Sequence, residues 1–182
     1  ANLMRRQGRL RNHCVVSTVM SNLGLAAALD KMGIRHETSK VGDRYVMEKM
    51  TDCGAVIGGE DSGHMIFADC HTTGDGSLTA LKLLEAIRVE NEPLSELSRL
   101  MTPYPQVLIN VEVRSKPDIE SVSEIADAIE SVESELEDKG RVLVRYSGTQ
   151  PICRIMVEGP SKGDTQRYCK QISDIICKNI GV

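Results

Sequence analysis

Residues 142–157 read Val-Leu-Val-Arg-Tyr-Ser-Gly-Thr-Gln-Pro-Ile-Cys-Arg-Ile-Met-Val. Two apolar runs flank a turn of Ser, Gly, Thr and Pro, and this pattern predicts two strands joined as a hairpin. One arginine then lies at each side of the turn, beside its hydroxyl groups and flexible glycine backbone, and such a set of donors suits a doubly charged tetrahedral oxyanion. We interpret the segment, which we call the arginine hairpin, as phosphate-binding; the alternative is an ordinary polar turn with surface arginines. The predicted phosphate-binding residues are Arg145, Ser147, Gly148, Thr149 and Arg154.

The composition indicates a globular protein of one or two domains. The 182 residues are 41% hydrophobic and 26% charged, and the 3% of aromatic residues indicate a mostly aliphatic core. A net charge of −4 argues against a nucleic-acid partner, which would require a basic face. Because we find neither a signal-peptide pattern nor an apolar run long enough to cross a bilayer, we predict a cytoplasmic protein without membrane contact.

The sequence shows no clear metal site and no nucleophile beside a base. The six cysteines include no Cys-x-x-Cys motif, and several lie in apolar stretches, so we interpret them as thiols in a reducing compartment rather than disulfides or zinc ligands. No Asp-x-Asp cluster is present to hold a divalent cation. We therefore assign no catalytic residue and no metal ligand to this chain. The cysteines are Cys14, Cys53, Cys70, Cys153, Cys169 and Cys177.

The N-terminal part alternates strand and helix patterns, which predicts a layered α/β domain with helices covering a sheet. Polar loops would gather at the ends of its strands, where such folds bind ligands. We expect strands near 14–19, 34–38, 55–59 and 65–68, and helices near 25–32, 43–53 and 78–90, the last with Leu81, Leu84 and Ile87 in register.

A proline-containing stretch, residues 93–105, contains a short helix and marks a boundary between domains 1–101 and 102–182. The second domain begins with a strand near 107–113 and a helix within 121–139, followed by the arginine hairpin and a helix near 162–179. This order predicts a small α+β domain with an antiparallel sheet and both helices on one side.

Residues 58–64, Gly-Gly-Glu-Asp-Ser-Gly-His, lie between two predicted strands and are called the Glu60 loop below. The Glu60 carboxylate accepts hydrogen bonds and the Ser62 hydroxyl donates or accepts them, which suits the neighbouring hydroxyls of a sugar. The order of residues differs from the Gly-x-Ser-x-Gly nucleophile motif, so Ser62 is a poor candidate nucleophile. The alternatives are a plain turn and, for His64, a structural histidine.

Residues 40–44, Lys-Val-Gly-Asp-Arg, precede a predicted helix. Lys40 and Arg44 are candidates to meet an anionic substrate near the positive end of that helix, whereas helix capping by Asp43 with two surface cations explains the residues equally well. Residues 72–76, Thr-Thr-Gly-Asp-Gly, indicate a strand-to-helix turn with a capping role.

Five segments together resemble the α-D-phosphohexomutase superfamily, and within it the bacterial phosphoglucosamine mutases. They occur in that family's order across nearly the whole chain. Asp61, Tyr146 and Gln150 depart from many members without removing a proposed donor, so the choice of sugar rests on the whole set of segments. The segments are Thr18–Leu25, Lys40–Val46, Gly58–His64, Thr72–Gly76 and Arg145–Pro151.

The resemblance implies that this chain corresponds to domains three and four of a four-domain enzyme, and the start at Ala1, without Met, makes us expect a fragment. It implies interconversion of glucosamine 6-phosphate and glucosamine 1-phosphate through a phosphoserine enzyme and a bisphosphorylated intermediate, in the amino-sugar metabolism that supplies cell-wall precursors. The phosphoserine and the magnesium ligands would belong to upstream domains one and two, leaving this part inactive alone.

The resemblance also implies roles for the site residues. Glu60, Ser62 and His64 would bind the sugar, and Lys40, Asp43 and Arg44 would line the same site. The arginine hairpin would bind the phosphate that does not react. Two alternatives remain: a phosphomannomutase or phosphoglucomutase of the same superfamily, and a stand-alone phosphosugar-binding module. The sequence does not determine the oligomeric state, and a homodimer is possible.

Overall fold

The computed structural model describes residues 1–182, which form two units, Ala1–Pro103 and Tyr104–Val182. Each unit contains its own sheet and its own buried apolar residues. No helix in the structure combines the length and the apolar character needed to span a bilayer.

The first unit is built on a four-stranded sheet with the order β2-β1-β3-β4. β1 pairs in parallel with β2 and with β3, whereas β3 and β4 pair antiparallel. All five residues of β1 are buried, as expected for a central strand covered on both faces. The strands are β1 (Cys14–Thr18), β2 (Arg35–Ser39), β3 (Ile57–Gly59) and β4 (Met65–Phe67).

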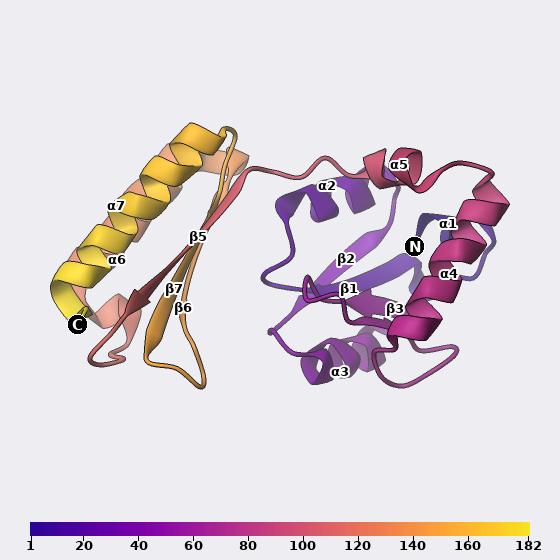
Figure 1. Ribbon diagram of the computed structural model, residues 1–182, viewed down its shortest axis with the longest axis horizontal. Helices are drawn as coiled ribbons and strands as arrows, with labels where there is room; N and C mark the ends of the chain where they lie inside the picture. The colour runs from indigo at the N-terminus through magenta and orange to yellow at the C-terminus, as the bar shows by residue number, and fades with distance from the viewer. The chain divides into compact units, whose positions relative to one another are not determined.

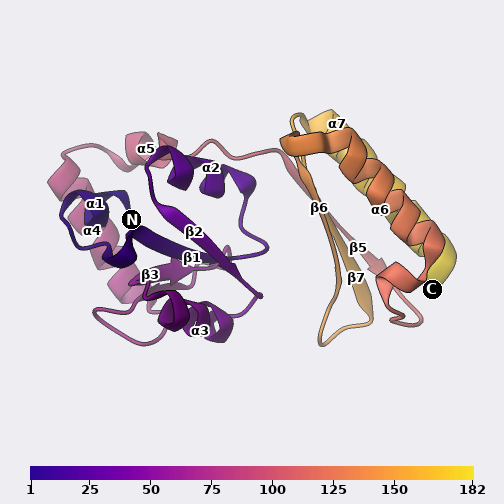
Figure 2. The ribbon, with the colours of Figure 1, turned by 180° about the vertical axis from the view of Figure 1, so that it is seen from behind.

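Helices cover both faces of this sheet, and α2 and α3 lie on opposite sides of it (Figures 1 and 2). Two core clusters reflect these layers: one contains Leu29 of α2, and the other contains Val46 and Met50 of α3. The helices are α1 (Asn2–Arg6), α2 (Leu23–Lys31), α3 (Asp43–Cys53), α4 (Gly76–Glu90) and α5 (Leu94–Leu97), with 3-10 turns at Arg11–His13 and Ser98–Leu100.

Side-chain caps are present at two helix starts. The Asn22 side chain accepts a hydrogen bond from the Gly24 N–H at the start of α2, and Asp75 accepts one from the Leu78 N–H at the start of α4. α4 nevertheless has no buried residue, and its Leu81 and Leu84 are 64% and 59% exposed. The apolar spacing that predicted α4 therefore located the helix correctly, but Leu78 packs against the core of this unit whereas Leu81 and Leu84 are exposed.

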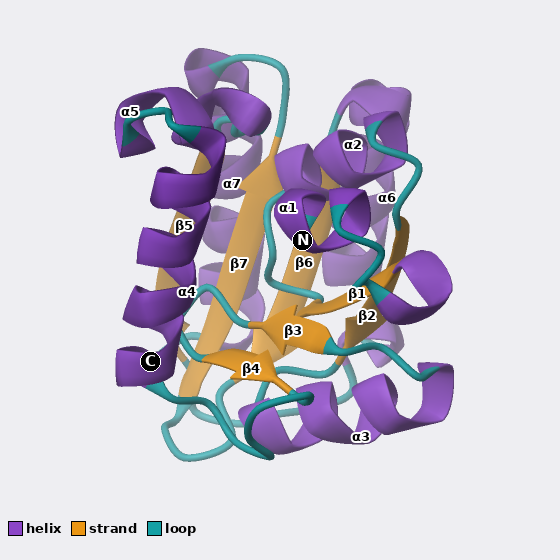
Figure 3. Cartoon of the chain, turned by 90° about the vertical axis from the view of Figure 1, so that its right-hand side faces the viewer, coloured by secondary structure: helices purple, strands orange, loops and turns teal.

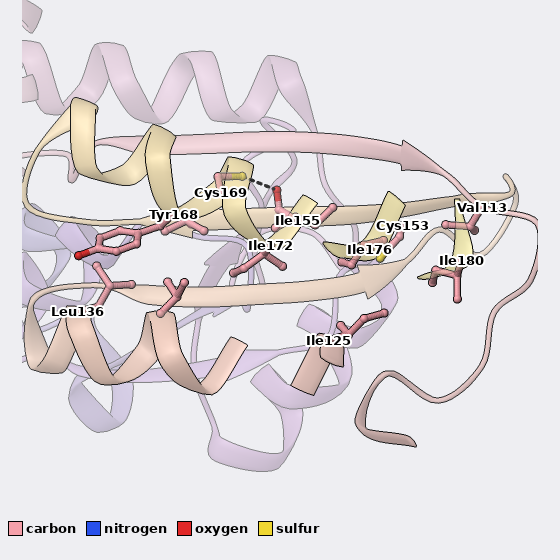
Figure 4. Close-up of a cluster of buried hydrophobic side chains, with 12 residues drawn as sticks. Val113, Ile125, Leu136, Cys153, Ile155, Tyr168, Cys169, Ile172, Ile176 and Ile180 are labelled. Carbon is pink, nitrogen blue, oxygen red and sulfur yellow. Dashed lines mark hydrogen bonds between the residues drawn. The ribbon is translucent and has the colours of Figure 1, made fainter. Parts of the chain in front are cut away.

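The second unit is a three-stranded antiparallel sheet, order β5-β7-β6, with α6 and α7 packed on one face (Figure 3). Cys153 and Ile155 of β7 point toward the helices, where they join Ile172 and Ile176 of α7 (Figure 4). Its elements are β5 (Gln106–Glu112), α6 (Ser123–Leu136), β6 (Arg141–Tyr146), β7 (Ile152–Glu158) and α7 (Lys162–Ile180), with 3-10 turns at Ile119–Ser121 and Glu137–Lys139. The predicted fold class, an α/β domain followed by a small α+β domain, is confirmed.

Candidate functional site

The arginine hairpin consists of β6 and β7, and its register places Arg145 directly opposite Arg154. Arg154 is also opposite Asn110 of β5. Cross-strand partners project from the same face of a sheet, and neighbours along a strand project from opposite faces. Because Cys153 and Ile155 face the helices, Arg154, Arg145 and Asn110 form a row on the face away from α6 and α7.

The two arginines have no acidic partner in the structure, and the Nε atoms of both are buried without a hydrogen-bond partner. Burial, followed by the charge of Arg154, lowers the pKa of the Arg145 guanidinium. Like charges directly opposite each other destabilise a sheet, and an unsatisfied buried donor costs about 1–3 kcal/mol. A bound anion would relieve both costs.

The turn of the hairpin is held by its own hydrogen bonds. Ser147 is buried; its N–H donates to the Ile152 carbonyl oxygen over 2.9 Å, and its hydroxyl accepts from the Gln150 N–H over 3.3 Å. The Ser147 hydroxyl, predicted to contact phosphate, thus also organises the turn.

Lys116 adds a third cation to the hairpin, one that the sequence analysis missed. Its Nζ donates to the Ser147 carbonyl oxygen over 2.6 Å. Lys116 lies in the loop after β5, more than thirty residues before Ser147. Only the sheet order, with β7 between β5 and β6, identifies the loop after β5 and the hairpin turn as neighbours.

The tip of the turn, Gly148 and Thr149, is exposed. A Cβ atom added to Gly148 would meet nothing within 4 Å, and this glycine is not in the left-handed region. Neither the backbone conformation nor packing within the chain therefore requires glycine at residue 148. The open space in front of it is available to a ligand that approaches the backbone closely.

The cavity beside β6 has a different character. It has a volume of about 650 Å³ and lies between the edge strand and α6, reaching from Lys116 to Tyr146. Glu130 and Glu133 of α6 line it. Lys116 and Arg145 line the cavity too, but these carboxylates disfavour an anion beside them, so we expect an oxyanion on the open face and at the tip of the hairpin.

In the first unit the structure brings the Glu60 loop to the start of α3. The Gly42 N–H donates to Glu60 Oε1 over 2.6 Å, and the Ser62 hydroxyl donates to Oε2 over 3.4 Å. His64 Nδ1 lies 3.8 Å from the same Oε2. The Glu60 side chain is only 10% exposed. Three predicted sugar-binding residues, Glu60, Ser62 and His64, are thus grouped around one carboxylate.

The capping prediction for Asp43 is wrong in detail. Asp43 is the first residue of α3, and Gly42, with φ 129°, occupies the N-cap position. The Asp43 carboxylate accepts from the adjacent Arg44 N–H over 2.8 Å. The carboxylate that accepts from the N-cap residue comes instead from Glu60, and its negative charge is favourable at a helix N-terminus.

Lys40 and Arg44 lie at the surface on either side of Gly42. The Arg44 guanidinium pairs with Glu48 over 2.8 Å, and this hydrogen bond raises the pKa of Arg44. Arg44 is therefore engaged with its own helix, whereas no ion pair involves Lys40. A cavity of about 280 Å³ is lined by Asp43 and Arg44 together with Thr72 and Thr73, so two of the segments noted in the sequence border one space.

No group of three or more His, Cys, Asp or Glu side chains in residues 1–182 is arranged to hold a metal ion. These residues therefore offer no cluster of three such side chains for a cation.

Two family models match these two units. The model described as "Phosphoglucomutase/phosphomannomutase, alpha/beta/alpha domain III" covers residues 1–104, and "Phosphoglucomutase/phosphomannomutase, C-terminal domain" covers residues 108–175. The chain belongs to the phosphoglucomutase/phosphomannomutase family. Within it, the chain is similar to phosphoglucosamine mutases: that of Syntrophobacter fumaroxidans is 56% identical over 179 residues, and that of Syntrophus aciditrophicus is 52% identical over 181 residues.

These alignments cover 98% and 100% of this chain but only 40% of each relative, so the chain spans about two fifths of the length of the curated relatives it matches. A structure of Aspergillus fumigatus N-acetylphosphoglucosamine mutase with glucose 1,6-bisphosphate matches with a TM-score of 0.82 at 19% identity, over 100% of this chain and 41% of that one. A phosphoglucomutase/phosphomannomutase family protein from Burkholderia thailandensis gives a TM-score of 0.70 at 20% identity, over 99% and 41%. At these identities the likeness shows the fold alone.

Proposed function

We propose that residues 1–182 are the sugar-binding and phosphate-binding units of a phosphoglucosamine mutase, which interconverts glucosamine 6-phosphate and glucosamine 1-phosphate. The similarity to curated phosphoglucosamine mutases, at 56% and 52% identity, supports this choice within the family. The observation that carries the proposal is the Arg145–Arg154 pair, two adjacent guanidinium groups without an acidic partner.

The arginine hairpin binds the phosphate that is not reacting. Two guanidinium groups balance a phosphate dianion and present forked donors to its oxygens. Gly148 and Thr149 add backbone and hydroxyl donors at the exposed tip. Lys116 fixes the carbonyl side of the turn at Ser147. Holding one phosphate in this way positions the sugar, and the rate of phosphoryl transfer depends largely on positioning and charge stabilisation.

The Glu60 loop recognises the sugar. Glu60 Oε1 is occupied by the Gly42 N–H, which leaves Oε2, with Ser62 and His64 beside it, to receive sugar hydroxyls. Lys40, Asp43 and Arg44 line the same end of α3. Engaging a sugar would require Arg44 to exchange its contact with Glu48.

The groups that transfer the phosphoryl group lie outside residues 1–182 in this proposal, in the remainder of a longer protein of the relatives' length. An Aspergillus fumigatus N-acetylphosphoglucosamine mutase has been solved with GlcNAc-6P and magnesium. In this proposal the ligands of any magnesium used by the longer protein also lie outside residues 1–182.

The test compares two samples, the 182-residue chain and the longer protein that contains it. The chain alone is expected to bind glucosamine 6-phosphate by calorimetry without converting it. The longer protein is expected to prefer glucosamine 1-phosphate over glucose 1-phosphate and mannose 1-phosphate in coupled assays. A preference for glucose or mannose phosphates would favour the phosphoglucomutase or phosphomannomutase alternative. Turnover by the chain alone would contradict our assignment of the transferring groups.

A further inference from the structure

Cys14 and Cys53 bring two thiols together in the first unit. Cys14 begins β1, Cys53 ends α3, and their Sγ atoms lie 3.7 Å apart in a thiol–thiol hydrogen bond. Cys14 is fully buried and Cys53 is half-buried. The proposed function uses neither thiol.

The backbones that carry the two thiols are fixed against each other. Asn12, two residues before Cys14, donates from Nδ2 to the Cys53 carbonyl oxygen over 2.9 Å, and Arg35 Nη2 donates to the same oxygen over 3.4 Å. Gly54, in the left-handed conformation, ends α3 directly after Cys53. A disulfide requires the two sulfur atoms to approach from 3.7 Å to about 2 Å.

The surroundings give the two sulfur atoms different roles. Burial, followed by the hydrogen bond with Cys53, raises the pKa of Cys14 to about 11, so Cys14 remains a thiol at neutral pH. Cys53 is the more accessible sulfur. The charged groups nearby are Arg35 and Lys49, both paired with Glu37, together with Asp52.

We propose that Cys14 and Cys53 form an oxidative modification site whose co-substrate is a peroxide. The Cys53 thiolate attacks one peroxide oxygen, the O–O bond breaks, and Cys53 becomes a sulfenic acid as hydroxide leaves. The Cys14 sulfur then attacks the Cys53 sulfur, the S–O bond breaks, and the oxygen leaves as water with the Cys14 proton. The sum is two thiols and one hydrogen peroxide converted to one disulfide and two waters.

The other cysteines lack this arrangement. Cys70 and Cys177 are exposed and Cys153 is buried in the core of the second unit; none of the three is hydrogen-bonded to another thiol. Cys169, in the second unit, directs its Sγ to the carbonyl oxygens of Val107 and Ile155, over 3.6 and 3.4 Å. Oxidation is therefore expected to select one pair of the six cysteines.

The disulfide would stabilise the first unit without closing the sugar site. It would close a loop of about 40 residues, which restricts the unfolded chain and raises the melting temperature. Cys53 and Asp43 lie at opposite ends of α3, about 15 Å apart along the helix axis. The new bond therefore forms far from the Glu60 carboxylate.

The test treats the purified 182-residue chain with hydrogen peroxide, blocks the remaining thiols with an alkylating reagent, and maps peptides without reduction. Trypsin combined with a Glu-specific protease separates Cys53, in residues 50–60, from Cys70, because cleavage after Glu60 falls between them. We expect peptide 12–31 joined to peptide 50–60, and a melting temperature that rises on oxidation and falls again on reduction.

Three variants sharpen the test. Cys14→Ser and Cys53→Ser are each expected to abolish the linked peptide and the rise in melting temperature, whereas the exposed control Cys70→Ser keeps both. Should Cys14→Ser fail to fold at its buried position, the half-buried Cys53→Ser still decides the matter. The proposal is overturned if peroxide modifies Cys70 and Cys177 while no Cys14–Cys53 peptide forms, or if Cys53 is oxidised without linking to Cys14.

Discussion

Arg145 and Arg154 face each other across the β6–β7 hairpin with buried, unpartnered Nε atoms and no acidic side chain to balance them. In a sheet built for stability alone, this pair is a local cost. Clusters of uncompensated, partly desolvated charge are typical of sites that bind a ligand of the opposite sign. The relationship between these two residues therefore underlies the phosphate assignment.

Replacing either arginine tests that assignment. Arg145→Ala and Arg154→Ala are each expected to weaken binding of glucosamine 6-phosphate by roughly 1.5–3 kcal/mol, tenfold or more in Kd, because each removes a charge-assisted hydrogen bond. Titration calorimetry measures the effect. Arg167→Ala is the matched control, since Arg167 of the same unit is at the surface and pairs with Glu135 and Asp164. Equal affinities for the chain and the two hairpin variants would rule out the hairpin as the phosphate site.

Gly148→Ala separates ligand access from folding. The added methyl group meets no atom of the chain within 4 Å, so the melting temperature is expected to stay within a degree or two, as for a surface substitution. Phosphosugar affinity is expected to fall, because the methyl group occupies the space in front of the backbone donors at the tip. A variant that binds as tightly as the parent chain would show that the ligand does not approach this backbone.

Gly42→Ala is expected to act on folding instead. Gly42 has φ 129°, which a residue with a Cβ atom rarely adopts, and the new Cβ would lie 3.2 Å from a ring carbon of Tyr45. We expect a loss of about 1 kcal/mol or more in the free energy of unfolding. Chemical denaturation measures it, with Gly148→Ala as the control glycine. No loss of stability would contradict the described N-cap geometry.

Glu60→Gln tests whether the Glu60 carboxylate serves both α3 and the sugar. The amide keeps an acceptor for the Gly42 N–H but removes the negative charge from the helix N-terminus, a change worth about 0.3–1 kcal/mol of stability. The free energy of binding glucosamine 6-phosphate is expected to fall by more than the free energy of unfolding. The affinity for inorganic phosphate is expected to stay the same. Weaker binding of inorganic phosphate to Glu60→Gln would contradict a role for Glu60 that is specific to the sugar.

The start of α7 predicts a pH dependence of stability. A hydrogen bond from Ser161, and then one from Arg167, holds the pKa of Asp164 below its usual value. A carboxyl with a lowered folded-state pKa stabilises the fold above about pH 4, and this contribution is lost as the pH falls through the lower folded value. Melting temperatures measured from pH 5 to pH 3 are expected to fall, and to fall less in Asp164→Asn. An equal fall of the melting temperature with pH in the parent chain and in Asp164→Asn would show that Asp164 does not contribute to this pH dependence.

The sequence was sufficient for the features that depend on local pattern. Apolar runs located β6 and β7, and the capping role expected of residues 72–76 is filled by Asp75 at the start of α4. The sequence was insufficient where a side chain forms its hydrogen bond with a residue far away in the chain. Glu60 accepts from Gly42, eighteen residues earlier, and Lys116 reaches Ser147 from the loop after β5. Local reasoning gave the capping role to Asp43, the nearest carboxylate, because the strand pairing that delivers Glu60 is a tertiary contact.

α4 shows a second limit. Its apolar spacing is that of an amphipathic helix, yet Leu81 and Leu84 are exposed in the first unit. Periodicity identifies an apolar face but does not say what packs on it.

The most direct test of the central claim is an amide-resolved NMR titration of the chain with glucosamine 6-phosphate. We predict saturable shifts of the Gly148 and Thr149 amides, next to Arg145 and Arg154, together with shifts in the Glu60 loop, and loss of the hairpin shifts in Arg145→Ala. Saturable shifts confined to other residues, or no shift at millimolar ligand, would contradict the account.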